Sequence, residues 1–142
     1  MRVKLLVSTF IALLLLQNKK PEGWDIFSGV TFYPKYFEEA GEELATPQFD
    51  DELKALEGKE IELSGFYIPF DMDSSIMISA LPYSSCFFCG GAGPETVAQV
   101  KIYPVPKLSP DTFVKVKGKL RLNDSDLTHM NFILNDASII KK

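Results

Sequence analysis

The stretch that decides the fold is Phe113-Val114-Lys115-Val116-Lys117-Gly118-Lys119-Leu120-Arg121-Leu122, near the C-terminal end of the chain. Apolar and charged residues alternate along it, which is the period-two pattern of a β-strand with one buried face. Gly118 interrupts the apolar series near its middle, where a barrel strand has to coil sharply. The stretch therefore predicts a curved strand over 113–122.

Four more segments predict strands of similar length. In the first, Ile61 and Leu63 alternate with glutamates, and Gly65 indicates a bulge or bend. These segments cover 59–70, 76–81, 96–103 and 131–140. Five short strands, with glycine bends in the first and fourth, predict a mainly β fold. The expected architecture is a small five-stranded OB-like Greek-key barrel, and an open five-stranded sandwich is the alternative.

One short helix is expected just before the first strand. Phe49, Leu53 and Leu56 fall at helical spacing, acidic residues occupy the first turn, and Gly58 suits the end of the helix. We therefore divide the chain into a leader over 1–20, an extension over 21–48 and an OB-like barrel domain over 49–142. The extension is rich in aromatic residues and largely irregular, with one possible short strand over 30–33 and a solvated turn around Gly41.

The first twenty residues predict an export signal. Arg2 and Lys4 form a basic start, and residues 5–16 are almost continuously apolar. A bilayer span needs about 20 apolar residues, so this run is typical of a signal peptide, with an uncleaved N-terminal anchor as the alternative. We expect an exported, periplasmic protein that touches the membrane only through this segment, if it is uncleaved. The net charge of -4 argues against a nucleic-acid partner.

Both cysteines of the chain lie in one string, Cys86-Phe87-Phe88-Cys89-Gly90-Gly91-Ala92-Gly93-Pro94-Glu95. Export would place them in an oxidising compartment, where thiols tend to pair. A disulfide across so small a loop stabilises the fold little in the chain-entropy model, so it would mainly stiffen the loop. A structural disulfide between Cys86 and Cys89 is the first interpretation.

Metal binding is the second interpretation. Two thiolates at this spacing can chelate Zn²⁺ or a soft ion. A structural zinc site takes four ligands, and His129 is the only histidine of the chain. Asp124, Asp126 or Glu95 could complete the site, or two chains could share it. Zinc is therefore a possible cofactor on Cys86, Cys89 and His129.

Thiol–disulfide exchange is the third interpretation. Redox-active cysteine pairs usually cap the N-terminus of a helix, which lowers the pKa of the thiol. Here a helical turn could start only at Pro94, five residues after Cys89, and the surrounding chain lacks a βαβ pattern. This context disfavours a thioredoxin-like activity without excluding it.

The sequence resembles a known group of proteins in three places: 55–69, 81–96 with its cysteine string, and the paired segments 114–120 and 132–139. The group consists of exported Bacteroidetes proteins of unknown function. They are similar in turn to a wider bacterial family of exported, OB-like proteins that also has no assigned activity. The resemblance covers roughly residues 24–140. It implies the fold and export, and it implies no catalytic residue.

Together these observations favour an exported binding or accessory module over an enzyme. The expected contact surface for a protein or small ligand is the loop over 83–95, and its residues are Tyr83, Phe87, Phe88, Gly90, Gly91, Gly93 and Glu95. The competing functions are a thiol–disulfide oxidoreductase using Cys86 and Cys89, and a purely structural disulfide in a protein-interaction module.

Overall fold

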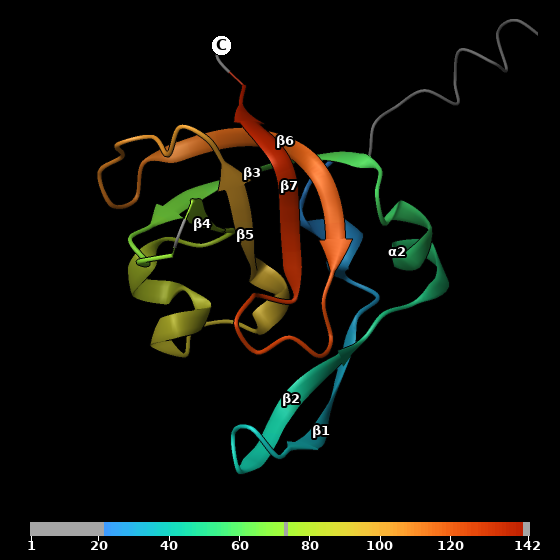
Figure 1. Ribbon diagram of the computed structural model, residues 1–142. Coiled ribbons are helices and arrows are strands. Elements are labelled where there is room, and N and C mark those ends of the chain that lie inside the picture. The colour runs from blue at the N-terminus through green and yellow to red at the C-terminus, as the bar shows by residue number, and fades with distance from the viewer. Residues whose placement is uncertain (1–21, 73, 141–142) are drawn as a thin grey trace, which may run out of the picture.

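A computed structural model describes residues 22–72 and 74–140 and shows a closed five-stranded barrel (Figure 1). Its strands are β3 (Glu60–Ile68), β4 (Ser75–Ser79), β5 (Val97–Ile102), β6 (Phe113–Leu122) and β7 (Phe132–Ile139). They pair in the order β3-β4-β5-β7-β6, and β6 closes the barrel on β3. Among the paired strands of this barrel, β5 and β7 alone run parallel. The predicted OB-like barrel is confirmed, and the open sandwich is wrong.

Alternate residues of the strands point into the barrel and form its main core. These are the apolar positions of the period-two pattern, and the buried strand residues are Ile61, Leu63, Ile76, Ile78, Ala98, Val100, Val114, Val116, Leu120, Phe132 and Leu134. Phe27, which precedes the barrel, stacks on Phe132 with their ring centroids 4.2 Å apart. The segment around Phe27, the 3-10 helix η2 (Trp24–Phe27), is therefore part of the barrel core.

The predicted helix is present as α2 (Asp51–Leu56). The carboxylate of Asp50 accepts a hydrogen bond from the backbone N–H of Leu53 over 2.7 Å, which caps the first turn. Gly58 adopts a left-handed conformation with φ of 79°, which ends the helix before β3. Leu53 is buried in the main core, so the helix covers the barrel next to η2.

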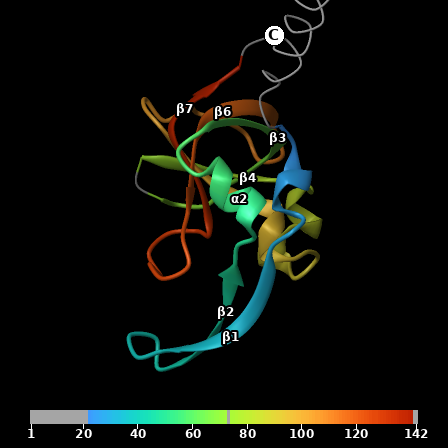
Figure 2. The same cartoon turned by 90° about the vertical axis from the view of Figure 1, so that its right-hand side faces the viewer.

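The extension is more regular than the sequence predicted. Strands β1 (Thr31–Phe37) and β2 (Glu42–Gln48) form an antiparallel hairpin, and the predicted turn around Gly41 joins them. Figures 1 and 2 show the hairpin reaching away from the barrel. The sequence did not predict this pairing, because proline argues against a strand and both strands contain one, Pro34 and Pro47. Most side chains of the hairpin are also exposed, so no apolar alternation marks the strands.

The two glycines expected to bend strands have different roles. At Gly118 the β6–β7 register shifts, and a Cβ there would lie 2.9 Å from the carbonyl oxygen of Asn135. Gly65 instead sits in a regular ladder opposite Val114, so the predicted bulge is absent. A Cβ on Gly65 would collide with the backbone carbonyl oxygen of Ser79. Gly65 is therefore required for close approach of the chain.

The predicted leader and its possible anchor lie outside the described residues. Within 22–72 and 74–140, no helix is both long enough and apolar enough to cross a bilayer. The first described residues lie against β3: Glu22 bridges Glu62, and the backbone N–H of Gly23 donates to the carbonyl oxygen of Glu62 over 2.9 Å. The described chain therefore begins beside the barrel wall.

Candidate functional site

The connection between β4 and β5 packs on the outside of the barrel, and we call residues 80–96 the cysteine loop. It contains three short 3-10 turns, η3 (Tyr83–Ser85), η4 (Phe87–Cys89) and η5 (Pro94–Thr96). Met77 and Val97 lie on the outer face of β4 and β5, yet both are fully buried. In OB-folds this strand pair forms the face that binds oligonucleotides and oligosaccharides. Here the chain itself covers much of that face.

A second, smaller apolar cluster lies under the cysteine loop. Its buried members are Ile68, Met77, Cys86 and Val97. Ile68 pairs with Met77 in the β3–β4 register, so the two side chains project on the same face of the sheet. Cys86, fully buried, is the residue by which the loop closes over this face. The first cysteine is thus a packing residue of the loop as well as a thiol.

Glycines shape the cysteine loop as predicted. Gly90 adopts a left-handed conformation with φ of 77°, which ends η4. The backbone N–H of Gly91 then donates to the carbonyl oxygen of Cys86 over 3.1 Å. A Cβ on Gly91 would collide with the carbonyl oxygen of Ser85, so only glycine fits there. These contacts fold the loop back on itself immediately after the second cysteine.

The start of the loop is held by a residue that sequence analysis missed. Asp111, in the turn before β6, accepts a hydrogen bond at Oδ1 from the backbone N–H of Tyr83 over 2.7 Å. Its own N–H donates to the carbonyl oxygen of Tyr67 over 3.0 Å, and its φ is 61°. Left-handed backbone at a residue other than glycine is strained. Asp111 therefore holds the loop at the cost of some backbone strain.

The two cysteines are in contact but differ in exposure. Cys86 is buried, Cys89 is exposed, and no disulfide joins them. Local desolvation, followed by the neighbouring Cys86 sulfur and its hydrogen bond, raises the pKa of the Cys89 thiol above its usual value. A higher pKa leaves less thiolate at neutral pH, whereas redox-active cysteines have lowered pKa values. The electrostatics of the pair therefore disfavour a nucleophilic Cys89.

The candidate zinc ligands do not gather at the cysteines. Among residues 22–72 and 74–140, no group of three or more His, Cys, Asp and Glu side chains is placed to hold a metal ion. His129 lies instead in the β6–β7 loop, with Nδ1 3.2 Å from Oε1 of Gln99. Asp126 accepts hydrogen bonds from the hydroxyl and the backbone N–H of Thr128, which lower the pKa of its carboxyl. Within the described part of the chain, the structure brings no third ligand of these types to the pair.

Aromatic side chains lie exposed on and beside the cysteine loop. Phe88 is 36% exposed and stacks on Phe70, which is 46% exposed, with ring centroids 4.9 Å apart. Phe87 meets Phe88 edge-on and packs down on the cluster under the loop. Tyr83 is also exposed. We call Phe70, Tyr83 and Phe88 the aromatic surface, and two of its three members were predicted as contact residues.

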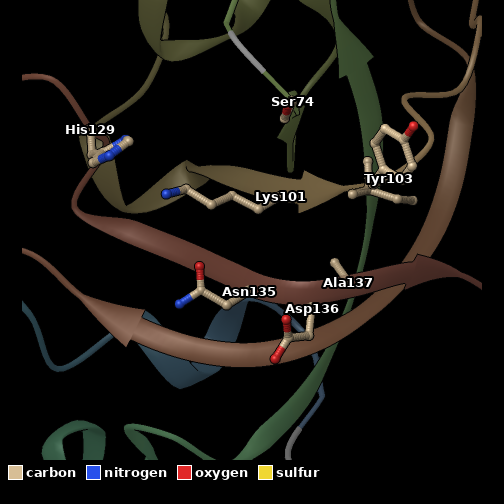
Figure 3. A pocket seen from close by; sticks show the side chains of 8 residues that line it. Ser74, Lys101, Tyr103, His129, Asn135, Asp136 and Ala137 are labelled. Carbon is tan, nitrogen blue, oxygen red and sulfur yellow. The ribbon is translucent and has the colours of Figure 1, made fainter.

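A hollow of about 740 Å³ forms a second candidate region (Figure 3). It lies along β5 and β7, where Lys101 and Asn135 flank each other, with His129 at one end and Tyr103 at the other. Of its lining residues, sequence analysis had singled out only His129. The rest were missed because β5 and β7 are far apart in the chain and meet only in the closed barrel.

The cysteine loop is the stronger of the two regions, because it combines a special turn, two adjoining thiols and exposed aromatic rings. No protein-family model matches the chain, and no curated protein matches it. A role for the loop therefore has to follow from its own contacts.

Proposed function

We propose that the protein is an exported binding module whose cysteine loop and aromatic surface form the contact site for a partner protein. The observation that carries this proposal is the stacked pair of exposed rings, Phe70 and Phe88. Exposed aromatic rings cost free energy in water, and aromatic residues are enriched at the centres of protein interfaces. Phe88 is held here by the cysteine loop, and Phe70 stacks on it from the segment that follows β3.

The rigidity of the loop supports binding further. Cys86 anchors it from below, Asp111 anchors its start, and Gly91 closes its turn. A contact surface that is already ordered loses little conformational entropy when it meets its partner. Binding through such a loop therefore needs fewer contacts for the same affinity.

Thiol–disulfide exchange is the competing function, and exposed Cys89 beside buried Cys86 would be its attacking and resolving thiols. The raised pKa of Cys89 counts against it, because the attacking species is the thiolate. A structural disulfide is compatible with the proposal. The contact between the sulfur atoms would allow a bridge after export, and the bridge would stiffen the same surface.

Site-specific photocrosslinking in the native host tests the proposal. A photoreactive amino acid is placed at position 88, at position 83 and, as the matched control, at position 36. Tyr36 is an exposed tyrosine of the β1–β2 hairpin, as Tyr83 is of the loop. We expect one discrete crosslinked partner from positions 83 and 88 and none from position 36.

The same partner should be lost when an aromatic ring is removed. In the protein carrying the crosslinker at position 83, Phe88→Ser is expected to abolish the crosslink while leaving the fold intact by circular dichroism. Equal crosslinking from the loop and from the hairpin, or none from either, would contradict the proposal.

A further inference from the structure

The methionines and cysteines of the described chain all lie in or against the cluster under the cysteine loop. The sequence has two cysteines and four methionines, and Met1 is the only one outside the described residues. Met77 and Cys86 are buried in the cluster under the cysteine loop, Met72 and Met130 pack against it, and Cys89 hydrogen-bonds Cys86. The main barrel core, by contrast, contains neither a methionine nor a cysteine among the described residues.

Four separate segments bring these side chains together. Met77 comes from β4, Met72 from the loop that follows β3, Met130 from the β6–β7 loop, and the two cysteines from the cysteine loop. A local sequence repeat cannot explain this convergence, because Met72 and Met130 lie 58 positions apart in the chain.

Met130 is held in place by a buried polar contact. Gln99 is 1% exposed and lies opposite Met77 in the β4–β5 register. Its Oε1 accepts a hydrogen bond from the backbone N–H of Met130 over 3.2 Å. Its Nε2 donates to Oγ of Ser75 over 3.0 Å, so the amide of Gln99 is oriented from both ends. The β6–β7 loop is therefore fixed beside the outer face of β4.

Thiolate sulfur binds both Cu(I) and Zn²⁺, whereas thioether sulfur is a soft ligand that suits Cu(I) and is absent from the thiolate, imidazole and carboxylate ligands of zinc. We propose that this sulfur cluster binds one Cu(I) ion through the thiolates of Cys86 and Cys89, with thioethers of Met72, Met77 and Met130 supporting it. This inference rests on the proposal that the cysteine loop is the functional part of the molecule, and it names a ligand for it.

The placement of the two cysteines suits such a site. Exposed Cys89 gives an ion in solution a first ligand, and buried Cys86 gives it a second ligand that water does not reach. Binding releases one proton from each thiol to solvent and changes no oxidation state, since the ion enters as Cu(I) and stays so. The Cu–S bonds replace two S–H bonds.

The alternative is that the methionines only fill space, because methionine adapts to irregular gaps. A Cu(I) titration of the full, reduced, metal-free chain without oxygen separates the two explanations. The probe is Cu(I) supplied as its complex with a chromophoric chelator, and colour loss reports transfer to the protein. We expect one equivalent to be transferred, whereas Zn²⁺ stays with a zinc chelator of matched strength.

Variants assign the ligands. Cys86→Ser with Cys89→Ser should abolish the transfer. Met72→Leu with Met130→Leu preserves the apolar volume, and we expect it to weaken Cu(I) binding by about tenfold, since loss of supporting interactions at metal sites costs roughly 10- to 100-fold. Ser84→Ala, at an exposed serine of the same loop, is the matched control and should bind Cu(I) as the unchanged chain does. Circular dichroism verifies that every variant is folded.

The outcomes are decisive. No transfer to the unchanged chain, or preferential retention of Zn²⁺, overturns the Cu(I) site. Unchanged affinity in the double leucine variant overturns the role of the thioethers. Failure of the proposed function gives a different result: Cu(I) binds as expected, but the crosslinker at position 88 captures no partner protein. If position 88 captures a partner but no Cu(I) is transferred, the partner surface is supported and the Cu(I) site is overturned.

Discussion

The carboxylate of Asp111 accepts a hydrogen bond from the backbone N–H of Tyr83 over 2.7 Å, and this bond ties the cysteine loop to the connection between β5 and β6. The two residues are 28 positions apart, so the bond exists only in the folded chain. Asp111 adopts left-handed backbone to make it. The position of the loop therefore depends on a residue outside it.

Replacing Asp111 tests this dependence. Asp111→Ala loses the acceptor and keeps the strained backbone, so we expect the loop to open more often and the protein to lose about 1–2 kcal/mol of stability. Alkylation of buried Cys86 in a Cys89→Ser background measures the opening. Asp111→Asn keeps an oxygen acceptor and tolerates this backbone, so it should match the unchanged protein. Equal alkylation rates for the alanine and asparagine variants would contradict the assigned bond.

Gln99 is expected to hold the β6–β7 loop. Gln99→Leu leaves the backbone N–H of Met130 without its buried acceptor, and we expect a loss of about 1–3 kcal/mol in the free energy of unfolding. Hydrogen exchange at Met130 should accelerate in the variant. The control is Lys101→Leu, two residues further along the same strand, which should change stability by less than about 0.5 kcal/mol. Similar effects from both changes would show that Gln99 does not act through this bond.

The raised pKa of Cys89 predicts a pH dependence. The folded pKa lies above the ordinary thiol value of 9.0, so folding favours the protonated thiol. This contribution to stability is complete below the unfolded pKa and is lost as pH rises through the folded pKa. At neutral pH, folded Cys89 should therefore react with iodoacetamide more slowly than the unfolded chain does, in a Cys86→Ser background for both.

The neighbouring cysteine should account for part of that shift. We compare Cys89 in the reduced, otherwise unchanged protein with Cys89 in Cys86→Ala. We expect a lower pKa of Cys89 in the variant, because the charge and the hydrogen bond of Cys86 that raise it are gone. A pKa of Cys89 that is lower in the unchanged protein than in the variant would reverse the assigned cause and would favour the exchange function.

Phe27 should contribute as much to the free energy of unfolding as a buried residue of a barrel strand does. It is fully buried and stacks on Phe132, so Phe27→Ala is expected to cost about 3–5 kcal/mol in urea denaturation. Tyr36→Ala, an aromatic change on the exposed hairpin of the same extension, should cost less than about 0.5 kcal/mol. A small effect at Phe27 would mean that η2 packs on the barrel without stabilising it.

Much of the barrel could be predicted from local pattern. Period-two alternation identifies three of the five strands, because burial on one side of a sheet repeats every second residue. The strand over 76–81 was predicted from an apolar run instead, since both of its faces are buried. The helix at 51–56 follows in the same way from its acidic first turn, its apolar spacing and the glycine after it. The β1–β2 hairpin could not be predicted, since its strands carry prolines and show mostly exposed side chains.

In the candidate site, too, local features could be predicted from the sequence and contacts between distant residues could not. The spacing of Cys86 and Cys89 with their glycines is a local signal, and it pointed to the loop correctly as a special turn. Asp111 and Gln99 gave no signal, because a polar residue in a turn or on one side of a strand is ordinary until its distant partner is known.

By itself the sequence determined the class of fold, the helix before it and the stretch that holds both thiols, because these depend on residues that are neighbours in the chain. Only the tertiary structure decided that one cysteine is buried and the other exposed, that His129 lies with Gln99, and that three methionines join the cluster that contains Cys86. The physical reason is barrel closure, which brings loops from distant parts of the chain onto one outer face.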